Sequence, residues 1–403
     1  MTIFVQIASY RDPELIPTLQ DCLEKAENPN ELTFGICRQF DPADKFDNLD
    51  HLQNNSKFRI IDIPCHESGG MCWAREKIQK LYDNETYTLQ LDSHHRFAKN
   101  WDTHLINQLL SAPSDKPLIT GYLGGYNHLT KNDFYYPYPA TQIIARRFAP
   151  PGTISFGNRL LDTEHNHIPA RFVSGHFFFT LGKHCVEYKY DPHLYFAGDE
   201  ISLSIRSYTL GYDLFHPKEF VIWHNYQTYE RPKHWQDHDD TKTKTEKNWY
   251  SRDTFSKQRI RQLLKEEDYN IDLGIYGLGS VRTHRDYEDY AGLDFKSRKI
   301  HPNTLTGSIP PTCNDKSWTE SLYQTNLDFR NMLDNLTTKS NHYNVQLKCN
   351  EEILYDKLYN ISDIEGNSYW DWLSCQTNKI PSHLILQALN DQQHVLNEII
   401  IDA

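Results

Sequence analysis

Residues 87–97, YTLQLDSHHRF, join a short apolar run to a cluster of polar side chains that could bind a ligand. Residues 87–91 predict a buried strand, because a short apolar run bounded by polar residues is typical of one. Asp92 and His94 follow this strand two residues apart, and such positions project to the same side of an extended chain. A carboxylate and an imidazole that converge in this way suit one divalent cation such as Mn²⁺, with His95 pointing away. The alternative is a solvated polar turn at the end of a strand.

Apolar runs of strand length alternate with amphipathic runs on both sides of this stretch. Predicted strands cover residues 3–8, 32–37, 58–63, 87–91 and 118–122, and predicted helices begin after Asp12 and cover 71–82 and 101–110. Asp12 can cap the first of these helices, with Pro13 at its first position. This alternation predicts an α/β fold with a mostly parallel sheet covered by helices on both faces. Ligands bind at the carboxyl ends of strands in such sheets, although no Gly-rich dinucleotide or P-loop motif occurs there.

The second half of the chain is predicted to add irregular segments and then a separate module. Residues 124–170 are rich in Tyr, Pro, Gly and Asn, which is typical of loops and short strands. Further strands are predicted at 172–181, 213–216 and 220–224, and further helices at 200–210 and 255–266. The pattern changes after about residue 300. We therefore expect one large domain over residues 1–300 and a small appended α/β module over 301–403.

A third candidate metal ligand follows another predicted strand. His224 comes directly after the apolar residues 220–223, so it is expected at an edge of the sheet. A single His in such a place is more often a hydrogen-bonded structural residue, but a metal site formed by Asp92 and His94 needs a third protein ligand. His234 and His238 are spaced for one face of a helix. Their neighbours are hydrophilic, and we expect a solvated loop there.

Three further charged positions allow two interpretations each. Asp199 and Glu200 begin a predicted helix, where carboxylates either complement the helix dipole or face a bound acceptor hydroxyl. Arg75 follows a Gly-Gly turn and could pair with a phosphate, with Glu76 or with another acid. Arg11 lies just beyond the first predicted strand, where a nucleotide base or ribose would lie in a fold of this kind.

The composition argues against some classes of binding partner and some cellular locations. The 403 residues carry 42 Lys and Arg against 54 Asp and Glu, a net charge of −12 that argues against nucleic-acid binding. The longest apolar stretch, residues 172–182, is shorter than the ~20 residues of a membrane-spanning helix. The N-terminal apolar run is expected to be a strand and not a secretion signal. Eight cysteines without paired CxxC spacing predict reduced, buried thiols and a cytoplasmic protein.

Several segments resemble one glycosyltransferase family, which includes the cytoplasmic hydroxyproline-polypeptide GlcNAc-transferase. In chain order they are IFVQIASYRDPELIPTL, GGMCWARE, LQLDSHHRF followed by WDTHL, FAGDEISLSIRSYTLGYDLFHP, WHNY and YGLGSVRTHRDYEDYAGLDF. The resemblance spans about residues 1–300, which would form the catalytic domain. A more distant likeness is to the polypeptide GalNAc-transferases, which also use an Asp-x-His metal motif and a later His.

This resemblance implies a GT-A (Rossmann-like) fold, a UDP-sugar donor with UDP-GlcNAc foremost, a divalent metal and retention of anomeric configuration. Mn²⁺ is the expected metal, and Mg²⁺ is the alternative. The implied metal ligands are Asp92, His94 and His224. The implied catalytic pair facing the acceptor is Asp199 and Glu200. The residues implied around the donor are Ser9, Arg11, Arg75, Asp92, Ser93 and, on a strand beside the sugar with Gly175, His176.

The implied chemistry needs no strong base, because the departing phosphate can take the proton of the acceptor hydroxyl. Asp199 or Glu200 is therefore expected to orient substrate and not to act as a nucleophile. The acceptor is expected to be a protein or a glycan, and a lipid-linked sugar stays open. Two rival hypotheses remain: a sister transferase that uses UDP-Gal, UDP-Glc or UDP-GalNAc, and a non-catalytic carbohydrate- or metal-binding module.

Overall fold

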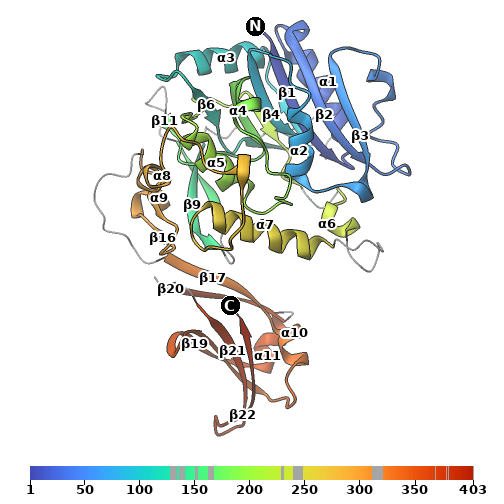
Figure 1. The fold of residues 1–403 in the computed structure, drawn as a ribbon. Helices are drawn as coiled ribbons and strands as arrows, with labels where there is room; N and C mark the ends of the chain where they lie inside the picture. Colours follow the sequence, from blue (N-terminus) through green and yellow to red (C-terminus); the bar gives the residue numbers. More distant parts are fainter. Residues whose placement is uncertain are drawn as a thin grey trace.

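The centre of the molecule is a twisted, mostly parallel sheet. The computed structural model describes residues 1–127, 134–135, 141–149, 153–161, 168–227, 231–238, 248–310, 321–367, 369–377, 379 and 381–402. Within these residues the sheet has the strand order β11-β13-β6-β12-β4-β1-β2-β3 (Figure 1). Its strands are β1 (Ile3–Tyr10), β2 (Leu32–Phe40), β3 (Phe58–Pro64), β4 (Tyr87–Asp92), β6 (Pro117–Thr120), β11 (Ile168–Pro169), β12 (Phe177–Leu181) and β13 (Asp213–His216). Strands β3, β2, β1 and β4 run parallel, whereas β12 is antiparallel to both of its neighbours. The predicted α/β fold with a mostly parallel sheet is confirmed.

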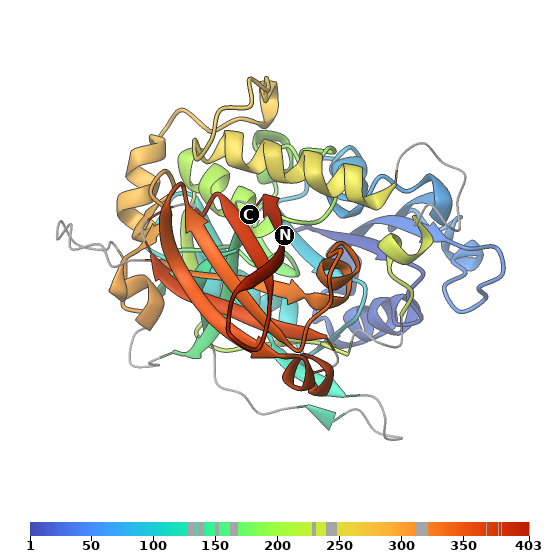
Figure 2. The same cartoon turned by 90° about the horizontal axis from the view of Figure 1, so that it is seen from below.

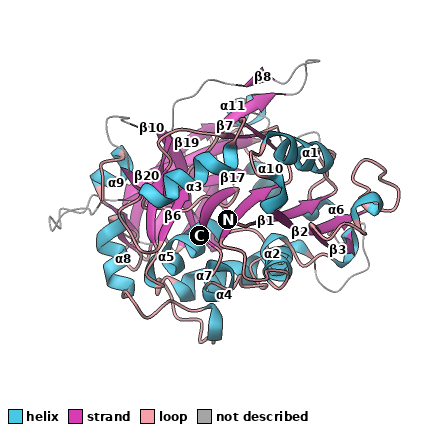
Figure 3. Ribbon diagram, turned by 90° about the horizontal axis from the view of Figure 1, so that it is seen from above, coloured by secondary structure: helices cyan, strands magenta, loops and turns pink. Residues whose placement is uncertain are grey.

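Helices cover both faces of this sheet. Figure 3 shows α1 (Leu15–Lys25) and α3 (Trp101–Ser111) on one side, and α2 (Met71–Gln79), α4 (His184–Glu187) and α5 (Asp199–Thr209) on the other. On the first side Leu15, Leu19 and Cys22 of α1 are buried against the sheet, as their helical spacing predicts. Helix α1 begins at Leu15 and not at Pro13, and its N-cap residue is Glu14 in place of the predicted Asp12.

A smaller sheet lies at the carboxyl edge of the large one. It has the order β5-β14-β7-β8 and is formed by β5 (His95–Phe97), β14 (Ile222–His224), β7 (Gly124–Asn127) and β8 (Phe134–Tyr135). Strand β14 is antiparallel to β5, and this pairing places His224 opposite His95. The short bend between β4 and β5 therefore carries its side chains to the end of β14.

The other described elements surround this core. They are β9 (Thr141–Ala149), β10 (Thr153–Leu160), α6 (His234–Asp237), α7 (Trp249–Leu263), α8 (His284–Ala291), β15 (Leu293–Asp294), β16 (Lys299–Ile300) and α9 (Pro302–Thr306), with short 3-10 turns at Pro29–Glu31, Asp50–Leu52, Cys65–Glu67 and Gly274–Tyr276. Only the second half of the strand predicted at 172–181 forms, as β12. The charged loop predicted at 241–247 lies outside the described residues.

The C-terminal part, drawn in orange to red in Figures 1 and 2, has a hydrophobic core of its own. Its sheets are β17 (Ser321–Asp328) with β20 (Trp370–Thr377), and β19 (Glu352–Asn360), β18 (His342–Cys349), β21 (His383–Leu389) and β22 (Val395–Asp402), joined by the short helices α10 (Phe329–Asp334) and α11 (Ile361–Gly366). Helix α9 is attached to the N-terminal part, because Thr304 Oγ1 donates to the Ala291 carbonyl at 2.6 Å. Our proposed domain boundary at residue 300 would therefore move to a position after α9.

The described residues bear on two expectations, which concern the thiols and the membrane-spanning helices. The cysteines described are all free thiols, and those at positions 22, 37, 65, 72 and 185 are buried. Among the helices that the structure describes, none combines the length and the apolar character needed to cross a bilayer.

Candidate active site

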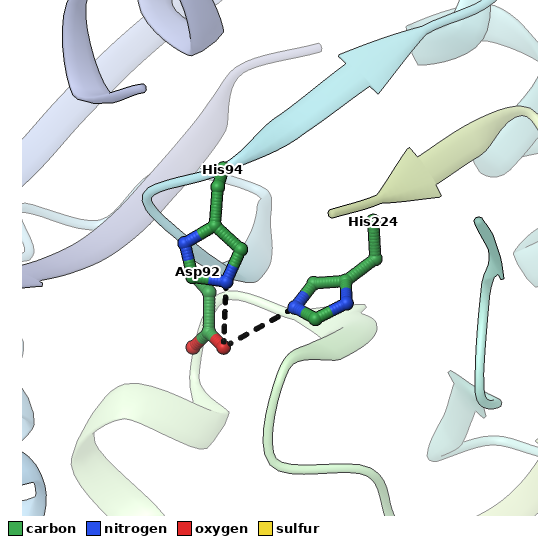
Figure 4. Close-up of side chains that lie close together, drawn as sticks. All are labelled: Asp92, His94 and His224. Atoms are coloured by element: carbon green, nitrogen blue, oxygen red, sulfur yellow. Dashed lines mark ion pairs between the residues drawn. The ribbon is translucent and has the colours of Figure 1, made fainter. Parts of the chain in front are cut away.

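Asp92, His94 and His224 meet at the carboxyl edge of the central sheet. Asp92 ends β4, His94 lies in the bend before β5, and His224 ends β14. One potential ligand atom from each residue lies within 4.8 Å of the others. Asp92 Oδ2 is 3.7 Å from His94 Nε2 and 3.6 Å from His224 Nε2, and Figure 4 shows the three side chains pointing toward one another. The structure thus brings together the three residues that the sequence suggested as metal ligands.

The donor set fits a divalent cation. Both ring nitrogens of His224 are buried without a hydrogen-bond partner among the described residues, which is costly unless something else binds them. Burial lowers the pKa of His224 to about 3, so the imidazole is neutral and keeps a lone pair for a metal. Burial raises the pKa of Asp92, but its neighbours His224, His94 and Arg75 outweigh this effect and hold the pKa well below the usual range. A carboxylate and neutral imidazoles suit ions such as Mn²⁺.

Arg75 joins this trio to the carboxylate that begins α5. The guanidinium is buried, and Nη2 lies 3.1 Å from Asp92 Oδ1 while Nη1 lies 2.7 Å from Asp199 Oδ2. Nη2 also donates to the carbonyl of Gly175 at 2.6 Å. Arg75 therefore pairs with neighbouring acids, and its partner is not Glu76. Burial raises the pKa of Asp199, although Arg75 opposes this effect.

Glu200 is held by two hydrogen bonds beside Asp199. The Tyr122 hydroxyl donates to Glu200 Oε2 at 2.7 Å, and the backbone N–H of Gly175 donates to Oε1 at 2.9 Å. Burial raises the pKa of Glu200 to about 7, although both hydrogen bonds oppose the shift. A carboxyl group that titrates near neutral pH can accept or donate a proton there.

His176 and His95 pack around the ligand trio without joining it. The rings of His176 and His224 stack with centroids 4.3 Å apart, and His176 Nδ1 lies 3.0 Å from Ser174 Oγ. His95 Nδ1 faces the Asp92 carbonyl at 3.0 Å. Burial holds the pKa of both rings well below the usual range, so both stay neutral.

Two cavities open on either side of Asp92. The first has a volume of about 320 Å³ and is lined by, among others, Tyr10, Gln39, Asp92, His94, Arg231, Lys233 and Trp235. The second has a volume of about 380 Å³ and is lined by, among others, Arg75, Asp92, Ile154, Phe156, His176, Asp199 and Glu200. Asp92, Met71 and Phe196 border both cavities. The site therefore has room for two ligand groups beside Asp92, one in each cavity, and His94 and His224 border the first.

Ser9 and Arg11, suggested for the donor, lie behind the wall of the first cavity and do not line it. Ser9 is fully buried beneath the cavity, and Arg11 pairs with Asp44, Asp237 and Asp41 at 2.7, 3.0 and 3.6 Å. Tyr10, between them in sequence, does line the cavity. The alternation of side chains along β1 explains the position of Ser9, because adjacent residues point to opposite faces of a strand. Arg11 follows the end of β1 and is turned toward its acidic partners.

The histidines of α6 correct a prediction. His234 and His238 were expected in a solvated loop, but their residues are only 8% and 2% exposed. His238 Nδ1 lies 2.9 Å from the Tyr195 hydroxyl, and the ring of His234 packs edge-on against Tyr195. The hydrophilic neighbours of these histidines in sequence gave no sign of this packing.

Asp12 lies at this site, although the sequence suggested it only as a helix cap. Four other residues at the site had no sequence signal: Tyr122, Arg231, Lys233 and Trp235. The carboxylate of Asp12 is buried, and Oδ2 lies 2.6 Å from Ser93 Oγ, 2.8 Å from His94 Nδ1 and 3.1 Å from Arg231 Nη1. The available signal was the position of Asp12 two residues after the end of β1, because β1 pairs in parallel with β4 and both strands end at the same edge. Oδ1 still accepts the Glu14 N–H at 2.9 Å, a turn contact near the start of α1.

Comparison with the GalNAc-T7 structure supports the fold. The GalNAc-T7 structure with UDP, GalNAc and Mn²⁺ superposes with a TM-score of 0.50 at 14% identity, over 72% of this chain and 50% of that one. The S. aureus TarS structure (residues 1–349) in complex with UDP gives a TM-score of 0.38 at 12% identity, over 56% of this chain and 60% of that one. The chain thus spans less than two thirds of each of these proteins. No curated protein matches it in sequence.

A family model identifies the protein family of this chain. The model described as "Glycosyltransferase (GlcNAc)" matches residues 2–53 and 41–297, which together cover the central sheet, both cavities and the possible metal ligands. The mostly parallel sheet with its site at the carboxyl edge agrees with this match. The chain belongs to the GlcNAc glycosyltransferase family and has a GT-A fold.

Proposed function

We propose that this transferase moves GlcNAc from UDP-GlcNAc to a hydroxyl group of a protein or glycan, with metal assistance and with retention of anomeric configuration. The observation that carries the proposal is the convergence of Asp92, His94 and His224 at the first cavity, with Asp92 also bordering the second. The GalNAc-T7 structure with UDP, GalNAc and Mn²⁺ supports the metal and the type of donor. The family description supports GlcNAc as the sugar.

Asp92, His94 and His224 would hold Mn²⁺ or Mg²⁺. When bound, the ion would offset the negative charge that develops on the departing diphosphate. The protein adds positive charge in the same cavity through Arg231 and Lys233. Burial, with Arg231 nearby, lowers the pKa of Lys233 to about 8, and the ammonium group is still mostly charged at neutral pH. An acidic chain can therefore bind a phosphate-bearing donor locally.

The first cavity would take the nucleotide. The rings of Tyr10, His234 and Trp235 border it, and flat aromatic surfaces suit the stacking of a base. Ser9 and Arg11 would act on the nucleotide only through the backbone or through their neighbours, since their side chains lie behind the wall. Ser93 donates a hydrogen bond to Asp12 and would thereby support the metal ligands indirectly.

The second cavity would take the sugar and the acceptor hydroxyl. Asp199 is engaged by Arg75 at Oδ2 and by the Cys72 thiol, 3.4 Å from Oδ1, which suits an orienting role and not a nucleophilic one. Glu200 borders the same cavity, and its raised pKa would let it share a proton with the acceptor hydroxyl. His176, stacked on His224, would border the sugar.

We also propose a cytoplasmic location. The support is the set of free, buried thiols among the described cysteines, which is usual in reducing compartments. The measurement that checks it is the oxidation state of Cys22 and Cys185 in protein isolated under thiol-trapping conditions.

Incubation of the purified chain with nucleotide sugars tests the function. Hydrolysis or transfer is measured with UDP-GlcNAc, UDP-GalNAc, UDP-Glc and UDP-Gal in Mn²⁺, in Mg²⁺ and in EDTA. We expect turnover of UDP-GlcNAc that EDTA abolishes. Preference for another sugar would support the sister-transferase hypothesis. Absence of a thermal shift with saturating UDP and Mn²⁺ would exclude the proposed function and leave a non-catalytic module.

The control variants separate the metal site from general damage. Asp92→Ala and His224→Ala are expected to lose both turnover and the thermal shift with UDP and Mn²⁺. His104→Ala is the matched control, because the side chain of His104 is 49% exposed and lies on α3, away from both cavities.

A further inference from the structure

We infer that Asp12 is a positioning residue that fixes the ring of His94, so that Nε2 presents a lone pair to the metal. The inference rests on the metal site of the proposed function. The two ring nitrogens of His94 have different neighbours. Nδ1 faces Asp12 Oδ2 at 2.8 Å, and Nε2 faces Asp92 Oδ2 at 3.7 Å. A neutral imidazole carries one proton, and only the nitrogen without it can bind a metal.

The carboxylate of Asp12 selects the useful tautomer. Its Oδ2 accepts from Ser93 Oγ at 2.6 Å and from Arg231 Nη1 at 3.1 Å, and His94 Nδ1 completes the set. A carboxylate at this distance strongly favours a proton on Nδ1, because two lone pairs would otherwise face each other. Nε2 is then bare toward Asp92 and His224. Carboxylates behind metal-binding histidines commonly act in this way.

Arg231 would favour the opposite tautomer of His94. Its Nη1 also contacts His94 Nδ1 directly, and an arginine can only donate. If Nδ1 were bare and accepted from Arg231, the proton would lie on Nε2 and block the metal. The two arrangements therefore predict opposite tautomers. The anionic Asp12, which is only 2% exposed and engaged by Arg231 as well, favours the first.

Asp12 is not needed to hold the backbone of the bend. Thr18 Oγ1 donates to the carbonyl of Ser93 at 2.9 Å and accepts the His95 N–H at 2.9 Å. The Asn225 N–H donates to the carbonyl of His94 at 3.0 Å. The bend is thus fixed from α1 and from the segment after β14. A change at Asp12 is expected to alter the imidazole of His94 without displacing the main chain.

Asp12→Asn is the sharpest variant. If its oxygen keeps the contact with Glu14, its amide group replaces Oδ2 and offers an N–H donor to His94 Nδ1. The proton then moves to Nε2, the nitrogen that faces Asp92. We expect Mn²⁺ affinity to fall by about 10- to 100-fold. Asp102→Asn is the matched control, because Asp102 is an equally buried carboxylate that binds the backbone N–H groups of Glu27 and Asn28.

Two measurements on the full chain test whether Asp12 positions His94, and neither of them depends on enzyme activity. Calorimetry gives Mn²⁺ affinity without nucleotide for the wild type, Asp12→Asn and Asp102→Asn. ¹⁵N NMR of histidine-labelled, metal-free protein gives the tautomer of His94, assigned with His94→Gln. We expect Nδ1–H in the wild type and Nε2–H in Asp12→Asn, with a loss of affinity only in Asp12→Asn.

Wild-type Mn²⁺ affinity in Asp12→Asn, or a wild-type His94 protonated on Nε2, would overturn the inference. If Asp12→Asn does not fold, which its melting curve will show, the wild-type tautomer decides alone. If the wild type binds no Mn²⁺, the proposed function fails, and the tautomer still shows whether Asp12 orients the ring.

Discussion

Arg75 and Asp199 form a buried ion pair, with 2.7 Å between Nη1 and Oδ2, and the side chains are 1% and 4% exposed. The same guanidinium reaches Asp92, so one residue of α2 joins the possible metal site to the start of α5. Burial of charge is costly, and a pair of this kind is maintained by mutual contact. Removal of Arg75 leaves the buried Asp199 without this cation, whereas removal of Asp199 leaves Arg75 with Asp92 as its remaining acidic partner.

We therefore predict that Arg75→Met lowers the free energy of unfolding by about 3–5 kcal/mol, measured by urea denaturation. Asp199→Asn alone is expected to be destabilising as well. The double variant should cost less than the sum of the two, because it removes both charges of the pair. Additive effects would show that Arg75 and Asp199 are not coupled. Arg285→Met is the control, because Arg285 forms exposed pairs on α8.

His224 illustrates a conflict between stability and metal binding. Its two nitrogens are buried without a hydrogen-bond partner among the residues that the structure describes, and an unsatisfied buried polar group costs roughly 1–3 kcal/mol. The ring packs against His176 and Tyr226, each with centroids 4.3 Å away, so another flat ring can take its place.

We predict that His224→Phe leaves the free energy of unfolding in EDTA unchanged or raises it by about 1 kcal/mol. The same variant should lose the stabilisation that Mn²⁺ and UDP give to the wild type. Urea denaturation with and without metal measures both effects. A large loss of stability in EDTA, or retained stabilisation by Mn²⁺, would contradict the assignment of His224 as a ligand.

The sequence predicted those parts of the site that depend on local pattern. Asp92 and His94 are two residues apart after an apolar strand, so strand periodicity predicts that they share one side. His224 ends another apolar run, and the need for a third ligand and the family resemblance joined it to them. Asp12 and His94 are 82 residues apart, and a carboxylate beside a helix start looks like an ordinary cap. His234 and His238 are buried by Tyr10 and Tyr195, which lie far away in the chain. Such contacts are set by tertiary packing, which local composition does not encode.

The raised pKa of Glu200 predicts a pH-dependent stability. The carboxyl group titrates near pH 7 in the folded protein and near its ordinary value of 4.5 in the unfolded chain. Between these values the unfolded state releases its proton first, so stability falls as the pH rises through this window. Above pH 7 the full cost of the buried charge remains.

Glu200→Gln removes this cost. We expect its melting temperature to exceed that of the wild type by roughly 2–6 °C at pH 8 and to match it near pH 4.5. Differential scanning calorimetry at both pH values measures the difference. Glu24→Gln is the control at an exposed position on α1, and it should show no such trend. A constant offset for Glu200→Gln across this range would contradict the raised pKa.

The C-terminal module has its own core and contacts the rest of the chain through β17. Its core is formed by residues between Leu327 and Ile399, and its members lie within the module itself. Strand β17 of the module lies beside β9 of the catalytic part. Strand β10 pairs with β9 and carries Ile154 and Phe156, which border the second cavity. The module therefore supports, through β9, the hairpin that faces the proposed acceptor.

We predict that residues 321–403 fold alone, with a cooperative melting transition followed by circular dichroism. Residues 1–310 should keep the thermal shift with UDP and Mn²⁺, because the first cavity lies on the other side of Asp92. They should lose affinity for the acceptor, with a KM raised by about tenfold, a loss equivalent to 1.4 kcal/mol. Phe156→Ala in the full chain should raise the same KM without changing that of the donor. If the fragment loses UDP binding and acceptor affinity together, the module supports the whole domain and not the hairpin.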